Sequence, residues 1–148
     1  MLEKFKKFNI KTVLFSKNDL KSNTILSSLK KVNPDLIVLA GFLLKIPKDI
    51  TLSFKNKIIN IHPALLPLYG GKGMYGENIH KAVIKNKEKN SGLTIHYVND
   101  KYDDGAIIFQ KKIRLEPDET PLSLSKKILK EEHTNYPAEI KKLLINDQ

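Results

Sequence analysis

The sequence predicts an α/β fold in a single domain spanning residues 1–148, with a mostly parallel sheet and an antiparallel extension. Two observations lead to this prediction. In the first half of the chain, short apolar runs typical of buried strands alternate with segments of helical periodicity. In the second half, two runs suited to strands flank an acidic turn. A length of 148 residues suits one domain with one core.

The first half is predicted to alternate strands and helices in the order β-α-β-α-β. Asn18 is a candidate cap for the first helix, and Gly41 ends the second strand. Short links between these elements favour right-handed crossovers in a layered sheet. In chain order the expected elements are a strand at 10–15, a helix at 19–31, a buried strand at 35–40, a short helix at 47–54 and a strand at 57–60.

The second half follows a glycine-rich loop at 69–76. A helix is expected at 77–86, and strands are expected at 91–98 and 105–113. A closing helix starts at Glu119–Pro121 and carries an apolar stripe towards the end of the chain. Pro137 is expected to kink or split this helix, because proline lacks the N–H that continues the hydrogen-bond ladder.

Composition limits the classes of function. A net charge of +10 raises affinity for nucleic acids, but Arg114 is the only arginine and the lysines are spread along the chain. We therefore interpret the charge as a solvated surface. The absence of cysteine excludes disulfides, thiolate zinc sites and a cysteine nucleophile. No apolar run approaches the roughly 18 residues that a membrane span needs. We expect a soluble, cytoplasmic protein that binds neither nucleic acids nor membranes.

Asn60 and His62 are the first candidates for chemistry, because residues two apart in a strand face the same side and ligands bind at the carboxyl ends of parallel strands. Asp103 lies in the acidic turn, which can fold back over the same edge. Asn60 can donate a hydrogen bond to a developing oxyanion, a protonated His62 can stabilise it further, and Asp103 can hold the imidazolium. This combination suits acyl or formyl transfer.

Each candidate also has a structural interpretation. Asn60 can be a turn former, His62 before a proline can satisfy backbone groups, and Asp103 stands in a common turn sequence. The loop at 70–76 lacks the spacing and hydroxyl of a phosphate-binding Walker sequence. The remaining histidines, His80, His96 and His133, show no spacing typical of metal ligands. We interpret His80 and His96 as structural.

Taken together, the motifs resemble the phosphoribosylglycinamide formyltransferase family. The matching segments cover nearly the whole chain and occur in the family's order. They are Val38–Phe42, Asn60–Pro67, Gly73–Gly76, His96–Val98, Asp103–Gly105 and Glu132–Pro137. The chain is also similar to the wider group that includes methionyl-tRNA formyltransferase and formyltetrahydrofolate hydrolase. The resemblance implies the Rossmann-like formyltransferase fold.

The resemblance implies transfer of a formyl group from 10-formyltetrahydrofolate to the amine of glycinamide ribonucleotide, in purine biosynthesis. Asn60, His62 and Asp103 match the catalytic positions, with His62 as general acid and Asp103 keeping it protonated and relaying protons through water. Glu132 matches a position that binds the ribose hydroxyls, and no metal is implied. The formyl donor would contact Asn60, Asp103, the loop 99–103 and the run Leu43, Leu44, Lys45 and Ile46.

One departure concerns the start of the chain. Family members begin with an additional strand, a glycine- and serine-rich turn that binds the substrate phosphate, and a helix. Nothing before Ile10 resembles this unit; Met1–Phe8 instead resembles a helix that leads into a later strand. Lys17 or Asn18 stands where members have an arginine. We expect an N-terminally truncated fold that lacks a central strand and exposes flanking apolar faces. The sequence leaves open an active enzyme, a folate-binding or inactive remnant, and completion by a homodimer or a complementing fragment.

Overall fold

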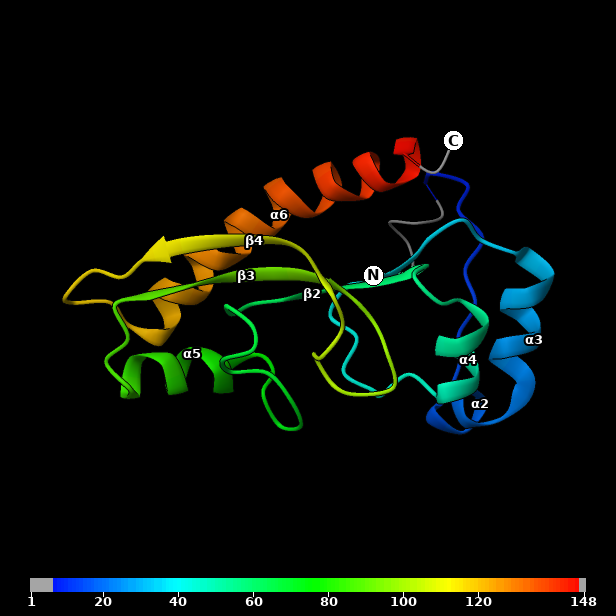
Figure 1. Ribbon diagram of the computed structural model, residues 1–148, viewed down its shortest axis with the longest axis horizontal. Helices are drawn as coiled ribbons and strands as arrows, with labels where there is room; N and C mark the ends of the chain where they lie inside the picture. The colour runs from blue at the N-terminus through cyan, green and yellow to red at the C-terminus, as the bar shows by residue number, and fades with distance from the viewer. Residues whose placement is uncertain (1–6, 147–148) are drawn as a thin grey trace. The chain divides into compact units, whose positions relative to one another are not determined.

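The computed structural model describes residues 7–146, and the chain divides into two compact units, Met1–Asn33 and Pro34–Gln148. Among the described residues, the first unit contains two short helices, and the second contains the four-stranded sheet and three further helices (Figure 1). All the predicted site residues lie in the second unit. The α/β class predicted from the sequence is confirmed.

The first unit has two helices, α2 (Lys17–Lys21) and α3 (Asn23–Val32), where the sequence predicted one continuous helix. The break is at Ser22, whose hydroxyl accepts a hydrogen bond from the Thr24 N–H and donates to the Asp19 carbonyl. Such local bonds compete with the helical ladder. The predicted cap at Asn18 is also wrong, because Ser16 and Asp19 form a capping box at the start of α2.

The predicted strand at residues 10–15 is not formed. These residues adopt irregular backbone, and the side chains of Val13 and Leu14 are 64% and 80% exposed. A strand is stabilised by hydrogen bonds to a neighbouring strand, so an apolar run alone does not create one. Most of the predicted N-terminal helix, residues 1–6, lies outside the described residues, and Lys7–Asn9 form a turn.

The sheet of the second unit has the strand order β1-β2-β3-β4 and is mixed. β1 pairs with β2 in parallel, whereas the pairs β2–β3 and β3–β4 are antiparallel. Each strand lies within two residues of its predicted position. The bounds are β1 Ile37–Leu39, β2 Ile58–His62, β3 Asn90–Tyr97 and β4 Ile107–Arg114.

Three helices accompany this sheet: α4 (Lys48–Ser53), α5 (Glu77–Lys85) and α6 (Pro121–Asn146). All three begin close to the predicted residues. Pro137 does not split α6, and it lies on an exposed side of the helix, where water can bond the carbonyl that loses its partner. Among residues 7–146, no helix combines the length and apolar character needed to cross a membrane.

The core lies on one face of the sheet, where α5 and α6 pack against each other and α6 runs along β3 and β4 (Figure 1). Alternation along β2 places Ile59 in this core and directs Asn60 and His62 to the opposite face. The site residues therefore lie over a rigid apolar layer. Its central side chains are Ile59, Leu93, Ile95, Ile79, Val83, Leu124 and Ile128.

Tyr136 connects α6 to the two parallel strands, at the last residue of β1 and the second residue of β2. Its hydroxyl lies 2.8 Å from the carbonyl oxygen of Leu39 in β1 and 3.3 Å from that of Ile59 in β2. Burial and the nearby Glu132 carboxylate raise the pKa of Tyr136, so the phenol keeps its proton and acts as a donor. One side chain thus connects the end of β1 with β2.

We expect Tyr136→Phe to lower the free energy of unfolding by about 1–3 kcal/mol, because the carbonyl groups of Leu39 and Ile59 lose the phenol hydrogen that they share. Urea denaturation followed by circular dichroism measures this change. Tyr75→Phe is the matched control, since Tyr75 is 51% exposed and its loss of a hydroxyl should change stability by less than about 0.5 kcal/mol. Equal stabilities of the two variants would contradict the role of Tyr136.

His80 is a buried histidine in α5. Its Nδ1 atom has no hydrogen-bond partner, and only 4% of the residue is exposed. Burial lowers the pKa of His80 below its ordinary value of 6.5, and the Glu77 carboxylate opposes this only in part. The folded protein therefore keeps His80 neutral at a pH where the unfolded chain binds a proton.

This difference predicts that the free energy of unfolding falls as the pH drops below about 6.5, because protons then favour the unfolded chain. Burial also lowers the pKa of His96, which acts in the same direction. The variant His80→Leu removes the titrating group. Between pH 6.5 and 5.5 it should reduce the slope of the free energy of unfolding against pH by up to about 1.4 kcal/mol per pH unit. Urea denaturation at several pH values tests this, with the exposed His133→Leu as control; an unchanged slope in His80→Leu would refute it.

Candidate functional site

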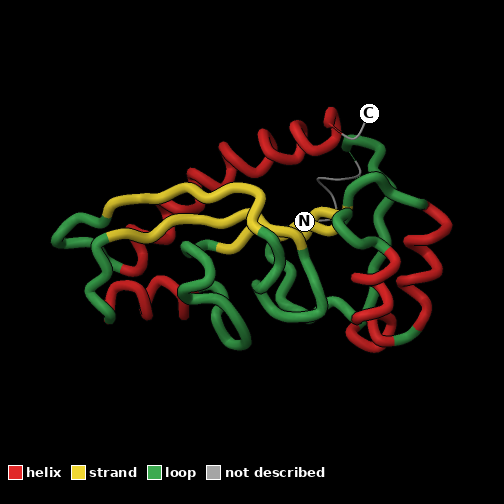
Figure 2. The backbone as a smooth tube through the Cα atoms, in the orientation of Figure 1, coloured by secondary structure: helices red, strands yellow, loops and turns green. Residues whose placement is uncertain are grey.

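Two long connections form the site: residues 63–76, which follow β2, and residues 98–106, which join β3 to β4. They lie side by side below the sheet in Figure 2. A hydrogen bond from the Gly71 N–H to Asp103 Oδ2 links them at 2.9 Å. The acidic turn therefore folds back towards the end of β2, as the sequence predicted.

The proline-bounded part of the first connection is fixed to the sheet by Thr94. The Thr94 hydroxyl accepts from the Leu66 N–H at 3.0 Å and donates to the Ala64 carbonyl at 2.7 Å. Gln110 of β4 adds a bond to the Leu66 carbonyl at 2.8 Å. The Leu66–Pro67 peptide bond is cis. These hydrogen bonds fix the backbone conformation of the residues that follow His62.

Asn60 in β2 faces His96 in β3, its partner across the antiparallel ladder. The Asn60 Nδ2 atom lies 3.3 Å from His96 Nε2, and His96 Nδ1 lies 2.8 Å from the Tyr97 carbonyl oxygen. A carbonyl can only accept, so Nδ1 carries the hydrogen; burial lowers the pKa of His96, which keeps the ring neutral. His96 Nε2 then accepts from Asn60, and this fixes the orientation of the Asn60 amide.

His62 is buried, and both ring nitrogens have neighbours. The Nε2 atom lies 2.8 Å from the carbonyl oxygen of Tyr69, so it carries a hydrogen. The Nδ1 atom lies 3.6 Å from Asp103 Oδ1. The ring is thus held between a backbone acceptor and a carboxylate, which is the arrangement needed to stabilise an imidazolium.

Asp103 brings these groups together. One carboxylate oxygen, Oδ1, lies within 3.6 Å of His62 Nδ1 and 3.7 Å of His96 Nε2, while Oδ2 accepts from Gly71. The residue has a φ of 50°, in the left-handed region that few side chains adopt. Gly105 allows this tight turn, because a Cβ atom there would lie 1.7 Å from the Tyr97 carbonyl oxygen.

A pocket opens beside these residues, and most of the predicted donor-binding residues line it. Its walls combine an apolar part with a polar edge. Leu43, which was also predicted, is not among the lining residues and is 61% exposed. His62 lies behind Asp103 rather than on the pocket wall. The lining residues are Leu39, Phe42, Leu44, Lys45, Ile46, Asn60, His96, Val98, Asn99, Lys101, Tyr102 and Asp103.

Glu132, the predicted ribose-binding residue, does not line this pocket. It lies in α6, one turn before Tyr136, and burial raises the pKa of its carboxyl group while His133 opposes the change. Tyr136 contacts Leu39, which does line the pocket. The structure therefore places Glu132 one helical turn from a residue that contacts the pocket lining, but not in the group formed by Asn60, His62 and Asp103.

Sequence reasoning missed two residues of the site. His96 was interpreted as structural, yet it orients Asn60 and lines the pocket. The sequence signal available for His96 was its position in the strand: it lies two residues after Thr94, so both side chains point to the same face of β3, which is the face of Asn60. Tyr69 was also missed, and no sequence pattern identifies it, since it acts on His62 through its backbone carbonyl.

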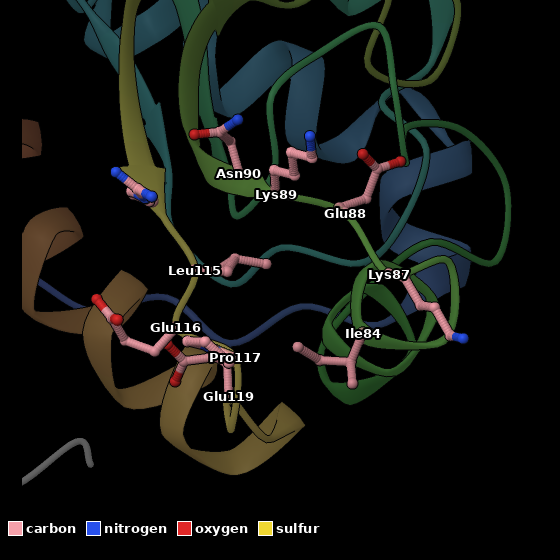
Figure 3. A pocket seen from close by; sticks show the side chains of 10 residues that line it. Ile84, Lys87, Glu88, Lys89, Asn90, Leu115, Glu116, Pro117 and Glu119 are labelled. Atoms are coloured by element: carbon pink, nitrogen blue, oxygen red, sulfur yellow. The ribbon is translucent and has the colours of Figure 1, made fainter.

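A second cavity of about 770 Å³ lies at the opposite ends of β3 and β4 (Figure 3). It is bounded by residues 84–90 and 114–119 and contains none of the predicted site residues. Lysines and glutamates alternate around it, which favours neither an anionic nor a cationic ligand. Its Glu88 accepts a hydrogen bond from the Tyr69 hydroxyl.

The chemistry that the first pocket supports is addition to a carbonyl group. The second N–H of Asn60 is available to an oxyanion, and His62 with Asp103 can move a proton nearby. Within residues 7–146, no cluster of at least three His, Asp or Glu side chains is suited to hold a metal ion.

Comparison with known proteins identifies relatives of the chain. The family model described as "Formyl transferase" matches residues 2–140. A chloroplastic phosphoribosylglycinamide formyltransferase from Arabidopsis thaliana is 44% identical over 79% of this chain and 40% of its own length. The Bacillus subtilis phosphoribosylglycinamide formyltransferase is 33% identical over 97% of this chain and 74% of its own length. The chain thus spans about two fifths of the plant relative.

Solved structures agree with these sequence matches. Phosphoribosylglycinamide formyltransferase from Bacillus halodurans superposes with a TM-score of 0.86 at 30% identity, covering 99% of this chain and 76% of that one. The enzyme of the same name from Anaplasma phagocytophilum gives a TM-score of 0.83 at 34% identity, covering 95% of this chain and 65% of that one.

The turn at Asp103 generates a prediction about Gly105. Gly105→Ala should lower the free energy of unfolding by about 2–4 kcal/mol, because its Cβ atom would overlap the Tyr97 carbonyl and force the turn to move. Gly73→Ala is the matched control: Gly73 has a φ of 89° but open space around it, so alanine should cost only about 1 kcal/mol. Thermal or urea unfolding compares the two, and a Gly105→Ala protein no less stable than Gly73→Ala would rule out the close approach.

Proposed function

The chain belongs to the formyl transferase family, and we propose that it transfers a formyl group from 10-formyltetrahydrofolate to the amine of glycinamide ribonucleotide. The observation that carries this proposal is the convergence of Asn60 and His62, at the end of β2, with Asp103 of the connection from β3 to β4. The names of the relatives give the substrate class, since they are phosphoribosylglycinamide formyltransferases.

In the proposed reaction the amine attacks the formyl carbon, and negative charge develops on the formyl oxygen. The free N–H of Asn60 donates to this oxygen, because the other N–H is engaged by His96. His62 supplies positive charge and a proton, and Asp103 stabilises the imidazolium from 3.6 Å. Collapse of the tetrahedral intermediate expels tetrahydrofolate as its nitrogen gains a proton.

The formyl donor is proposed to occupy the pocket beside Asn60. Apolar side chains of Leu44, Ile46 and Val98 suit a flat heteroaromatic ring, and the polar edge with Asn99 offers hydrogen bonds to its ring nitrogens. Lys45 lies at the same pocket, 6.0 Å above the ring of Tyr102, and favours an anionic ligand. Leu43 is proposed to contribute through its backbone, since its side chain points elsewhere.

Glu132 is proposed to bind the ribose of the second substrate. Its carboxyl group is partly buried in α6, one turn before Tyr136, and this burial raises its pKa. Hydroxyl groups of a ribose would supply hydrogen-bond donors to the charged carboxylate. No other function is favoured by a specific observation.

We propose that both units belong to one formyltransferase domain, because a single family model matches residues 2–140 across their boundary. We also propose the cytosol as the location.

We expect His62→Asn to lower kcat for glycinamide-ribonucleotide-dependent deformylation of 10-formyltetrahydrofolate by at least about a hundredfold, because a general acid contributes about that much. Binding of the formyl donor, measured by fluorescence titration, should change by less than about threefold, since His62 lies behind the pocket wall.

His133→Asn is the matched control, because His133 is exposed on α6 and should keep full activity. Wild-type protein that binds the donor but transfers no formyl group would support a folate-binding protein instead. Unchanged activity in both His62→Asn and Asp103→Ala would overturn the proposed mechanism.

A further inference from the structure

Tyr69 contacts two parts of the second unit through different atoms. Its carbonyl oxygen accepts the hydrogen on His62 Nε2 at 2.8 Å. Its phenol donates to Glu88 Oε1 at 2.7 Å and accepts from Asn86 Nδ2 at 2.9 Å. Glu88 and Asn86 follow the end of α5, so the phenol is fixed at a point remote from the pocket.

The backbone of Tyr69 has a conformation that needs support. Its φ of 59° lies in the left-handed region, which costs a non-glycine residue about 1 kcal/mol or more. The following Gly70 is crowded, since a Cβ atom there would lie 2.6 Å from Leu66 Cδ2. Without the two phenol bonds, rotation about the N–Cα bond of Tyr69 would relieve its unfavourable φ and move its carbonyl away from His62.

The phenol remains a good donor in this position. Burial and the Glu88 carboxylate raise the pKa of Tyr69, so its proton stays on the phenol oxygen near neutral pH. Glu88 is itself positioned in the turn that ends α5, where its N–H bonds to the Val83 carbonyl. The anchor of Tyr69 therefore lies in the hydrogen-bonded turn that ends α5.

We propose that Tyr69 is a positioning residue. Its phenol anchors its own backbone carbonyl, and this carbonyl keeps a hydrogen on His62 Nε2. The other nitrogen, Nδ1, is then the one that gains and loses the reacting proton. This rests on the proposed formyl transfer. Nδ1 faces Asp103 Oδ1, and Asp103 lines the pocket whereas His62 does not. The proton that reaches the leaving nitrogen departs from Nδ1 past Asp103, and the proton released by the attacking amine returns along the same path.

The variant that tests this is Tyr69→Phe, which removes both phenol bonds and keeps the ring. Long-range ¹H–¹⁵N spectra of the ligand-free protein report which nitrogen of His62 carries hydrogen. Wild type should show hydrogen held on Nε2 with slow exchange. In Tyr69→Phe that hydrogen should exchange about tenfold faster and the second tautomer should become visible. Tyr75→Phe, which removes a half-exposed hydroxyl from the same loop, should match wild type.

Activity gives a second readout. Tyr69→Phe should lower kcat for formyl transfer by about tenfold and change KM for the formyl donor by less than about twofold, because the pocket wall is untouched. Glu88→Ala, which removes the acceptor but keeps Tyr69, should reproduce both effects. Glu88→Gln keeps an oxygen at the same place and should restore at least about half of the wild-type kcat.

The two proposals fail in different ways. Wild-type protein without transfer activity would refute the proposed function, yet the spectra of His62 would still decide the role of Tyr69. A single Nε2-protonated tautomer with unchanged exchange in folded Tyr69→Phe overturns the positioning role. If Tyr69→Phe does not fold, as judged by circular dichroism, the same result in Glu88→Ala overturns it.

Discussion

The carboxylate of Asp103 connects the parts of the candidate site. It faces His62 and His96 with one oxygen and accepts the Gly71 N–H with the other. These contacts join two connections that are about 30 residues apart in sequence, and each connection is fixed to the sheet independently. Asp103 can do this only in a left-handed backbone conformation, which depends on the close fit of Gly105 against Tyr97. The close packing of Gly105 against Tyr97 thus determines where the charge of the Asp103 carboxylate lies relative to the two histidines.

The apolar layer on the face of the sheet opposite Asn60 and His62 gives these polar contacts a fixed support. The buried face of β2 packs on α5 and α6, and Tyr136 connects α6 to the end of β1 and to Ile59 of β2. Because the side chains of a strand alternate, the burial of Ile59 determines where Asn60 points. The position of the reactive groups therefore follows from the same burial that stabilises the fold.

The sequence predicted the elements of the second unit and the group of Asn60, His62 and Asp103 well, because strand alternation and strand ends are local properties. The failures concern tertiary context. The run at 10–15 has strand composition but forms no strand, and Ser22 breaks a helix through its side chain. His96 looked structural because its partner, Asn60, comes from a distant strand. Tyr69 acts through a backbone carbonyl, which no residue pattern reports. The roles assigned to the site residues stay predictions.

The orientation of Asn60 has a consequence for selectivity. The Tyr97 carbonyl decides which nitrogen of His96 carries hydrogen, and His96 in turn decides that Asn60 presents an N–H rather than its oxygen on that side. The pocket is therefore matched to a carbonyl oxygen, which can only accept. In the proposed transfer, a protonated formimidoyl group, whose nitrogen has only N–H donors in place of the oxygen, would bring one donor against another. The backbone carbonyl of Tyr97 would then contribute to discrimination between these two one-carbon units, through His96 and Asn60.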